Sequence, residues 1–296
     1  MKVFAPGKMV LTGAYAVLRG HPSVVVAVSR GAVADDARRA RSSREVRAAL
    51  GTDDAPEVDT RALYDGQRKL GLGASAAVLV ATLGLRGLAN GKDLKDRATR
   101  RELFLEGRRA HEKAQSGGSG VDVAASVYGG ALVYRLDEHG EGHVVEARLP
   151  ENVGFFAYAA RTSARTTELR ALVDRLRTQR PVEDARIFED LGAASRAAAE
   201  ACLGGDASAF VAASIAFGES LSALGRAADA PIFSAADEEL ARLARSSGSA
   251  FHPSGAGGGD VAVLLGTKPS TFDAEAVRLG YEPLPLTVDV GGVRAL

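Results

Sequence analysis

Gly71-Leu72-Gly73-Ala74-Ser75-Ala76-Ala77 joins a glycine-rich turn to an apolar run that continues to Leu85. Glycines let a backbone approach an anion with no Cβ in the way, and the first turn of a helix offers unpaired N–H groups and the positive end of its dipole. A serine at the start of that helix can cap it or reach a magnesium ion. The stretch therefore predicts a phosphate-binding loop, although a turn of this kind can also be a plain connection.

Two familiar nucleotide-binding motifs do not fit this loop. It has neither the lysine nor the second spacing of a Walker loop. A dinucleotide fingerprint needs a buried strand before its glycines, whereas here the polar stretch 65–69 precedes them. Support for a phosphate site therefore has to come from the rest of the chain.

Length and composition describe an ordinary globular protein. The chain has 296 residues, of which 46% are hydrophobic and 25% are charged, which suits two domains or one large one. Lys plus Arg equals Asp plus Glu at 37 each, so the net charge favours neither nucleic acid nor an anionic membrane as a partner. We expect a phosphorylated small-molecule substrate to be held by a local cluster of cations, in a monomer or a homodimer.

Cysteine content and hydropathy narrow the setting. The single cysteine, Cys202, excludes an intramolecular disulfide and a cysteine-based metal cluster, and its apolar neighbours predict burial. Pro6, Gly7 and Lys8 interrupt the apolar residues near the N-terminus, which argues against a signal peptide. No stretch approaches about 18 uninterrupted apolar residues, the length of a membrane-spanning helix. We therefore expect a soluble cytoplasmic protein.

The first half of the chain mixes strands and helices. Short apolar runs between turn residues predict strands over 9–11, 14–18 and 24–28. The charged segment 35–47 predicts an exposed hairpin or helix. Helices are predicted over 74–88, 100–115 and 121–127, and strands return over 131–136, 144–148 and 155–160.

The second half is mainly helical. Apolar residues at helical spacing predict helices over 167–177, 183–203, 208–224 and 235–245. A strand over 261–265, a helix over 272–279 and a strand over 284–288 complete the prediction. Because strands give way to helices near Pro150, we place a domain boundary there, between an N-terminal domain over 1–150 and a C-terminal domain over 151–296.

A lysine near the N-terminus is the first further candidate. Ala5-Pro6-Gly7-Lys8 places it on a rigid turn, from which its ammonium group can bring a point charge to a transferring phosphoryl group or to a substrate oxygen. Taken alone, Lys8 is equally well explained as a solvated surface residue.

An aspartate at the start of a helix is the second. In Ser119-Gly120-Val121-Asp122, the carboxylate stands one residue into the helix that follows the glycines. N–H groups around such a carboxylate keep it ionised and let it accept a hydrogen bond from a substrate hydroxyl. The alternative is a helix-capping acid with no other task.

A second glycine-rich loop is the third. His252-Pro253-Ser254-Gly255-Ala256-Gly257-Gly258-Gly259-Asp260 has four glycines within five residues, which is more than a passive turn needs. Such a backbone can wrap closely around a ligand.

Taken in order, these stretches resemble the motifs of the GHMP small-molecule kinases: Pro6-Gly7-Lys8, Gly71 to Ala77, Ser119 to Asp122, and Ser254 to Asp260. The resemblance covers nearly the whole chain, and four motifs in the right order are far more specific than any one of them. Within the superfamily the chain is most similar to phosphomevalonate kinases. These typically have histidine at the position of His111, where mevalonate kinases have a magnesium-binding glutamate, and Gly13-Ala14-Tyr15 resembles their Gly-Glu-Tyr stretch.

The resemblance implies an α+β fold, with an N-terminal domain like ribosomal protein S5 and a ferredoxin-like C-terminal domain. It implies transfer of the ATP γ-phosphoryl group, with Mg²⁺, to the phosphate of 5-phosphomevalonate, which yields 5-diphosphomevalonate in isoprenoid synthesis. Lys8 and Asp122 would be the catalytic pair that flanks the attacking oxygen. The ATP-binding residues would be Gly71, Leu72, Gly73, Ala74, Ser75 and Ala76, with Ser75 also the magnesium ligand. The substrate-binding residues would be Tyr15, His21, His111, Ser119, Ser254, Gly255, Ala256 and Gly257.

Three positions depart from the family pattern. Ala74 replaces the first serine of a Ser-Ser pair, Ala14 replaces a glutamate, and His252 stands where phosphomevalonate kinases commonly have lysine. The short interval before the phosphate loop also suggests a reduced lid over the nucleotide. Cations for the carboxylate and phosphate of the substrate are expected among His21, Arg30, Lys69, His111, Arg135, Arg161, Arg165 and His252.

These departures concern the acceptor more than the phosphoryl transfer, so two other functions stay open. One is another GHMP kinase that acts on mevalonate, a sugar or an amino-acid alcohol. The other is a nucleotide-binding protein without catalysis, which serves as a sensor or partner. Retention of Lys8, Ser75 and Asp122 together argues against the second alternative.

Overall fold

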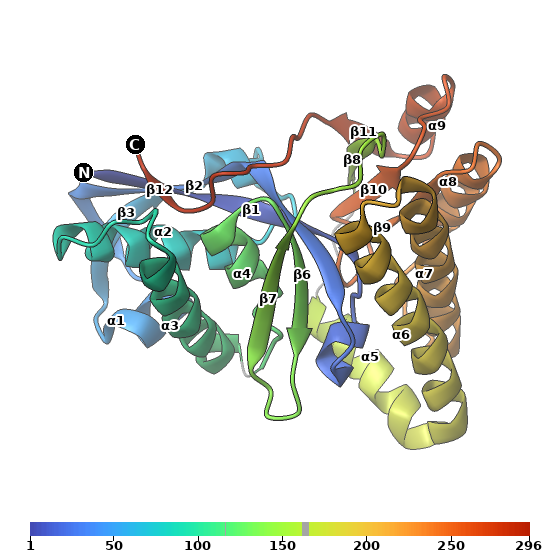
Figure 1. The fold of residues 1–296 in the computed structure, drawn as a ribbon, viewed down its shortest axis with the longest axis horizontal. Helices are drawn as coiled ribbons and strands as arrows, with labels where there is room; N and C mark the ends of the chain where they lie inside the picture. Colours follow the sequence, from blue (N-terminus) through green and yellow to red (C-terminus); the bar gives the residue numbers. More distant parts are fainter. Residues whose placement is uncertain (116, 162–165) are drawn as a thin grey trace. The chain divides into compact units, whose positions relative to one another are not determined.

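The computed structural model describes residues 1–115, 117–161 and 166–296 and shows an α+β chain, as predicted (Figure 1). The chain forms two compact units. The first comprises Met1–Met9, Val25–Glu146 and Thr287–Leu296, and the second comprises Val10–Val24 and Ala147–Leu286. The change of unit nearest to Pro150 falls between Glu146 and Ala147, and segments 10–24 and 287–296 each belong to the unit formed mainly by the other half.

A six-stranded sheet supports the first unit. Its order is β12-β1-β2-β6-β7, with β3 paired to β2. Strand β12 pairs antiparallel to β1, with Val3 opposite Ala295, and β3 pairs antiparallel to β2. The strands are β1 Lys2–Thr12, β2 Ser23–Arg41, β3 Asp54–Asp59, β6 Ala131–Leu136, β7 Gly142–Ala147 and β12 Arg294–Ala295, and a small hairpin is formed by β4 Tyr64–Asp65 and β5 Arg68–Lys69.

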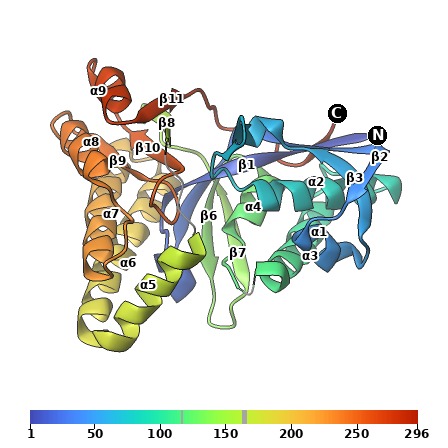
Figure 2. The same cartoon turned by 180° about the vertical axis from the view of Figure 1, so that it is seen from behind.

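Four helices belong to this unit, and those predicted from periodicity are confirmed. They are α1 Arg44–Leu50, α2 Ala74–Ala89, α3 Arg97–Gln115 and α4 Val121–Tyr128, with a short 3₁₀ turn at Arg61–Leu63. Helix α2 is apolar on nearly all sides and is correspondingly buried, with Leu79, Val80 and Leu83 fully enclosed. It packs against α3 and α4, which places the end of α3 and the starts of α2 and α4 in one region (Figure 2).

A four-stranded antiparallel sheet in the order β11-β8-β10-β9 supports the second unit. Its strands are β8 Phe155–Ala160, β9 Ala250–Pro253, β10 Val261–Leu265 and β11 Tyr281–Leu284, and its helices are α5 Thr166–Gln179, α6 Pro181–Gly204, α7 Ala207–Ala227, α8 Ala235–Arg245 and α9 Phe272–Arg278. Rings of Tyr158, Phe251 and Phe272 pack at 5.3–6.0 Å between centroids and form the centre of its core. The predicted helices and the strand over 261–265 are confirmed.

Among the described residues, α7 is the one helix whose length and composition would let it cross a membrane. Half of its 18-residue apolar window is buried, and it packs against α6 and β9. The core helix of a globular unit passes the same test, so composition alone does not identify a membrane span.

Two predicted strands are wrong. Residues 14–18 form a turn and a 3₁₀ helix, Ala16–Arg19, because Gly13 turns the backbone at φ +88° and Leu18 N–H then bonds to the Tyr15 carbonyl at 3.0 Å. The strand predicted over 284–288 lies earlier, over Tyr281–Leu284, because Pro285 has no N–H for a ladder.

The charged segment 35–47 is both extended and helical. Strand β2 continues exposed to Arg41, and α1 then begins after Ser43, whose hydroxyl accepts from the Val46 N–H at 3.2 Å. This cap fixes where α1 starts.

Candidate functional site

The glycine loop leads directly into α2. Its last residue before the helix, Gly73, has φ +78°, in the left-handed region that favours glycine. Leu72 is fully buried and anchors the loop in the core of the unit. No side chain caps the first turn of α2 among the residues that the structure describes. The free N–H groups at the start of α2 therefore suit an anion such as a phosphate.

Lys8 is attached to this loop by its backbone and by its side chain. Its N–H donates to the Leu72 carbonyl at 2.9 Å, and its Nζ donates to the Gly71 carbonyl at 3.2 Å. One residue pair further on, the Ser126 hydroxyl of α4 donates to the Pro6 carbonyl at 2.7 Å. The lysine-bearing turn is thus held between the loop and α4.

Lys8 and Asp122 lie beside Gly73. A Cβ added at position 73 would come 3.0 Å from Lys8 Cγ and 3.7 Å from Asp122 Cβ. The structure therefore brings the two predicted catalytic residues together at the residue where α2 begins. Their roles remain predictions, and their proximity is a finding.

Asp122 is the second residue of α4 but does not cap it. The N-cap is Gly120, and Asp122 Oδ1 accepts from the adjacent Val123 N–H at 3.0 Å. Its other oxygen, Oδ2, lies 3.5 Å from His111 Nε2, and the side chain is 20% exposed. One carboxylate oxygen is therefore left to face a ligand.

His111 is buried beneath the start of α2. Its Nε2 lies 3.2 Å from Ser75 Oγ and 3.0 Å from Gln115 Nε2, and the Gln115 amide nitrogen lies 3.2 Å from Ser75 Oγ. Only 4% of the residue is exposed. A residue in this position reaches a ligand through Ser75 and Asp122 more readily than by itself.

The oxygen donors of this region fit a magnesium ion that is also held by phosphates. Within the described residues no group of three His, Cys, Asp or Glu side chains could hold a metal. Mg²⁺ normally keeps several waters and takes one or two protein oxygens plus substrate phosphates. The Ser75 hydroxyl and the Asp122 carboxylate, on either side of one imidazole nitrogen, match that smaller requirement.

Ser119 lies in the turn before α4. Its carbonyl accepts from the Tyr134 hydroxyl, and its own hydroxyl is 3.4 Å from the Val121 N–H. Beside it, Gly120 has φ +78° and leaves no room for a Cβ, which would press on the Arg108 side chain at 2.8 Å.

The second glycine loop, residues 254–260, is braced by the backbone of the second unit. The Ser254 N–H donates to the Val261 carbonyl at 2.9 Å, and the Gly258 N–H donates to the Ile232 carbonyl at 3.0 Å. A Cβ at Gly257 would lie 2.4 Å from that carbonyl oxygen, so this close approach requires glycine. The Ser254 hydroxyl is buried and has no hydrogen-bond partner among the described residues.

Tyr15 is tied to the same loop. Its hydroxyl donates to the Ala256 carbonyl at 2.7 Å, its ring is buried, and burial raises the pKa of the Tyr15 hydroxyl. Its φ of 61° is unusual for an aromatic residue. The predicted substrate residues Tyr15, Ser254, Gly255, Ala256 and Gly257 thus form one group in the second unit.

His21 contacts helix α6. Its ring lies against Gly192, where a Cβ would come within 2.5 Å of the ring, and its Nδ1 is 2.9 Å from Arg196. Burial and the charge of Arg196 lower the pKa of His21. Nearby, Arg19 forms a two-toothed ion pair with the buried Asp184 at 2.6 and 2.8 Å. His21 therefore lies in a packed, cation-rich setting.

His252 does not serve as a cation, so its inclusion among the expected cations is wrong. The ring is fully buried against Phe217 and Gly218, and this burial lowers the pKa of His252 to about 4. The imidazole is neutral at physiological pH. Arg165 lies outside the described residues.

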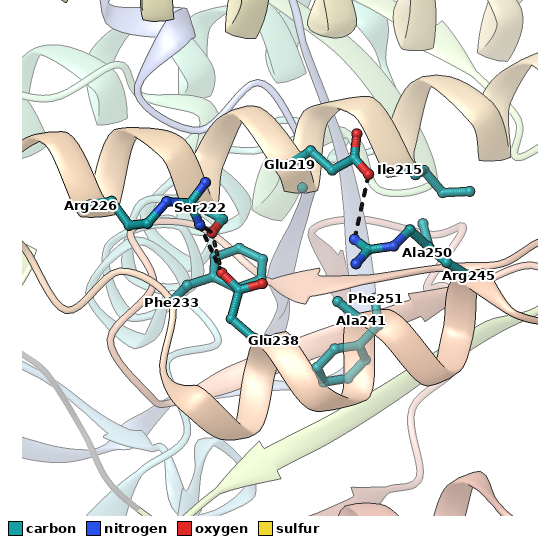
Figure 3. A pocket seen from close by; sticks show the side chains of 11 residues that line it. Ile215, Glu219, Ser222, Arg226, Phe233, Glu238, Ala241, Arg245, Ala250 and Phe251 are labelled. Carbon is teal, nitrogen blue, oxygen red and sulfur yellow. Dashed lines mark hydrogen bonds and ion pairs between the residues drawn. The ribbon is translucent and has the colours of Figure 1, made fainter.

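A pocket that no sequence motif indicates lies between α7, α8 and β9 (Figure 3). It has a volume of about 180 Å³ and an apolar floor that includes Phe251. Two ion pairs join the helices across it, Arg226 with Glu238 at 3.2 Å and Arg245 with Glu219 at 3.6 Å. None of the predicted site residues lines this pocket.

Sequence reasoning missed Gln115 and Glu45 as neighbours of Ser75. Gln115 ends α3, and its amide nitrogen lies 3.3 Å from Glu45 Oε1 at the start of α1. Gln115 shares a motif with His111, which was a signal, but nothing in the spacing links Glu45 to that motif. The contact depends on the packing of α1 against α2 and α3.

Comparisons with known proteins connect this geometry to one family. Residues 43–130 match the model of the GHMP kinases N terminal domain. Phosphomevalonate kinase from Streptomyces sp. (strain CL190) is 28% identical over 257 residues, which cover 78% of this chain and 67% of that protein. Mevalonate kinase from Pyrococcus abyssi (strain GE5 / Orsay) is 34% identical over 122 residues, and this match spans 41% of the chain and a third of the relative (33%).

Solved structures resemble the whole chain. A Lin0012 protein from Listeria innocua has a TM-score of 0.86 at 20% identity and covers 99% of this chain and 98% of its own. Streptococcus pneumoniae phosphomevalonate kinase, in complex with phosphomevalonate and AMPPNP, has a TM-score of 0.79 at 16% identity and covers 97% and 99%. These likenesses confirm the predicted fold.

Proposed function

The chain belongs to the GHMP kinases and is therefore a phosphotransferase, and we propose that it phosphorylates 5-phosphomevalonate with ATP. A phosphate oxygen of the acceptor attacks the γ-phosphorus of ATP. The bond between that phosphorus and the β–γ bridging oxygen breaks, and 5-diphosphomevalonate and ADP are formed. The names of two similar proteins support this acceptor, one by sequence and one by fold.

One observation supports the chemistry above the others. Lys8 and Asp122 lie beside Gly73, where the N–H groups and the positive dipole end of α2 face outward. Such an arrangement offers fixed positive charge to phosphate oxygens, together with one carboxylate to orient the incoming group. A structural turn would need neither charged residue.

The acceptor explains why a strong general base is unnecessary. The second proton of a phosphate monoester has a pKa of about 6, so the attacking group is already largely ionised at neutral pH. The demanding task is to bring two anions together. Lys8 and the loop N–H groups reduce their repulsion and align them, and Asp122 acts as a positioning charge as much as a base.

Magnesium belongs to this proposal as a companion of ATP. Ser75 and Asp122 would hold it through oxygen, and when bound it would neutralise phosphate charge. The residues of the second unit, Tyr15, His21 and the loop 254–257, together with His111 and Ser119, would bind the acceptor. We propose a soluble cytoplasmic enzyme that acts as a monomer or homodimer.

A second candidate is phosphorylation of mevalonate itself. The match to the mevalonate kinase of Pyrococcus abyssi, with the higher identity of the two relatives, favours it. Its acceptor is a hydroxyl group, which requires deprotonation and would give Asp122 a larger role as a base.

A coupled assay of ADP release with Mg-ATP tests these candidates. Purified protein is offered 5-phosphomevalonate, mevalonate, galactose and homoserine separately. Turnover that is fastest with 5-phosphomevalonate supports the proposal, whereas faster turnover with another acceptor transfers the chain to that kinase activity. Measurable ATP binding with no turnover on any of them supports the non-catalytic alternative.

A further inference from the structure

The amide nitrogen of Gln115 has more neighbours than hydrogens. It lies 3.3 Å from Glu45 Oε1, 3.2 Å from Ser75 Oγ and 3.0 Å from His111 Nε2. An amide NH₂ group has two hydrogens to donate and no lone pair to offer. The positions of the hydrogens in this cluster are therefore constrained.

The carboxylate of Glu45 takes one of these hydrogens, because an ionised carboxylate only accepts. The other hydrogen points toward Ser75 Oγ and His111 Nε2, which are themselves 3.2 Å apart. A proton on His111 Nε2 would face the N–H of Gln115 at 3.0 Å, donor against donor. His111 therefore carries its proton on Nδ1 and presents Nε2 as an acceptor.

Glu45 decides which end of the Gln115 amide faces inward. The oxygen and nitrogen of an amide are assigned from their hydrogen bonds, since the two have nearly the same shape. With the oxygen turned inward, two acceptors would face each other across 3.3 Å, which is unfavourable. Glu45 is held at the start of α1, where burial raises its pKa but hydrogen bonds from its own N–H, from Gln115 and from Ser43 outweigh this and lower it. It is thus an ionised acceptor.

Asp122 has the opposite effect on the same ring. Its Oδ2, 3.5 Å from His111 Nε2, favours a proton on that nitrogen. Two carboxylates therefore compete for the hydrogen positions around His111. If Asp122 prevailed, His111 would donate to it, and its oxygen would no longer be free for a ligand.

We propose that Glu45 and Gln115 are positioning residues that hold His111 as the Nδ1–H tautomer, so that the Ser75 hydroxyl can donate to Nε2 and Asp122 remains unbonded to His111. Ser75 then directs a lone pair of its oxygen outward, as a contact to magnesium or phosphate requires. The tautomer follows from geometry alone. Its consequence for the use of nucleotide rests on the proposed function.

Nitrogen-15 NMR of the imidazole rings tests the tautomer directly, on the protein without substrate. The chain has five histidines, so the His111 signals are assigned by their loss in His111→Asn. We expect the Nδ1–H tautomer in the wild type and in Glu45→Gln, whose amide oxygen still accepts from Gln115. In Glu45→Ala the acceptor is gone, and we expect the Nε2–H tautomer to rise strongly.

Kinetics of the same variants test the consequence. Glu45→Ala should lower kcat/KM for Mg-ATP about tenfold, the range seen when a residue behind a metal ligand is removed, and leave the KM of the acceptor unchanged. Glu57→Ala, in an exposed pair with Arg38 at 4.0 Å, is the matched control and should change neither tautomer nor kinetics.

Two results would overturn the inference: an Nε2–H tautomer in the wild type, or the same tautomer in Glu45→Ala as in the wild type. Because the NMR measurement needs no turnover, it stands apart from the proposed function. A tautomer that responds to Glu45 in a protein with no kinase activity would keep the inference about His111 and remove the proposed reaction.

Discussion

The backbone N–H of Lys8 donates to the carbonyl of Leu72 at 2.9 Å, which joins the N-terminal strand β1 to the phosphate loop before α2. The Lys8 ammonium donates to the neighbouring Gly71 carbonyl at 3.2 Å. A lysine attached at both ends cannot follow solvent, so its charge stays at the loop. This relationship makes the first prediction specific to position as well as to charge.

Lys8→Ala should lower kcat by about two orders of magnitude, because a fixed positive charge beside the transferring phosphoryl group is lost. The melting temperature should change little, since the backbone hydrogen bond to Leu72 remains. Steady-state kinetics and thermal unfolding measure both. Lys2→Ala, at an exposed residue paired with Asp35 at 3.3 Å, is the control and should keep full activity.

Asp122→Ala should also lower kcat by about two orders of magnitude while the fold stays intact. The carboxylate lies beside Gly73 and has one oxygen bonded to its own helix, so its removal costs little packing. Near-normal turnover in this variant and in Lys8→Ala would remove both residues from the catalytic centre.

Ser75→Ala should weaken the use of Mg-ATP more than the binding of the acceptor. The hydroxyl stands at the start of α2 beside His111, where it can serve a magnesium ion. Activity is titrated against magnesium at fixed ATP, and the KM of the acceptor is measured in parallel. An unchanged magnesium dependence counts against this role. Ser246→Ala, whose exposed hydroxyl bonds only to the Leu243 carbonyl among the described residues, is the control.

Gly73→Ala and Gly51→Ala separate backbone strain from damage to the site. Both glycines have positive φ, 78° and 69°, so each alanine should cost about 1–2 kcal/mol of stability. The Cβ at position 73 would also meet Lys8 at 3.0 Å, whereas nothing lies within 4 Å at position 51. We expect similar loss of stability in urea unfolding, and loss of activity only in Gly73→Ala. Equal activity in both would show that the loop tolerates a displaced lysine.

Acid should destabilise the protein partly through His252. The unfolded histidine binds a proton below its ordinary pKa of 6.5, but the buried ring does so only near pH 4. The unfolded state therefore binds more protons in this window, and the stability present above pH 6.5 is lost as the pH falls toward 4, by up to about 1.4 kcal/mol per pH unit. Urea unfolding across this range should show a shallower pH dependence in His252→Phe than in the wild type. Equal slopes would mean that the ring is not buried as a neutral group.

Much of the fold could be predicted because its signals are local. The apolar run after Gly73 predicts a buried helix, and the helical spacing over 235–245 predicts α8 with its bounds. The failures have local causes that compete with pattern. An apolar run over 14–18 folded as a tight turn after Gly13, and Pro285 ended a strand that the apolar residues around it suggested.

The sequence by itself determined where glycine must turn the chain, which stretches are helical, and the order of the four motifs that identify the family. These properties depend on backbone conformation and on side-chain periodicity, which neighbouring residues carry. Only the tertiary structure decided that Glu45 and Gln115 meet Ser75, and that His252 is a buried neutral ring instead of a cation. Those facts depend on how separate helices pack, and a pKa or a hydrogen-bond direction is set by the groups that packing brings within a few ångströms.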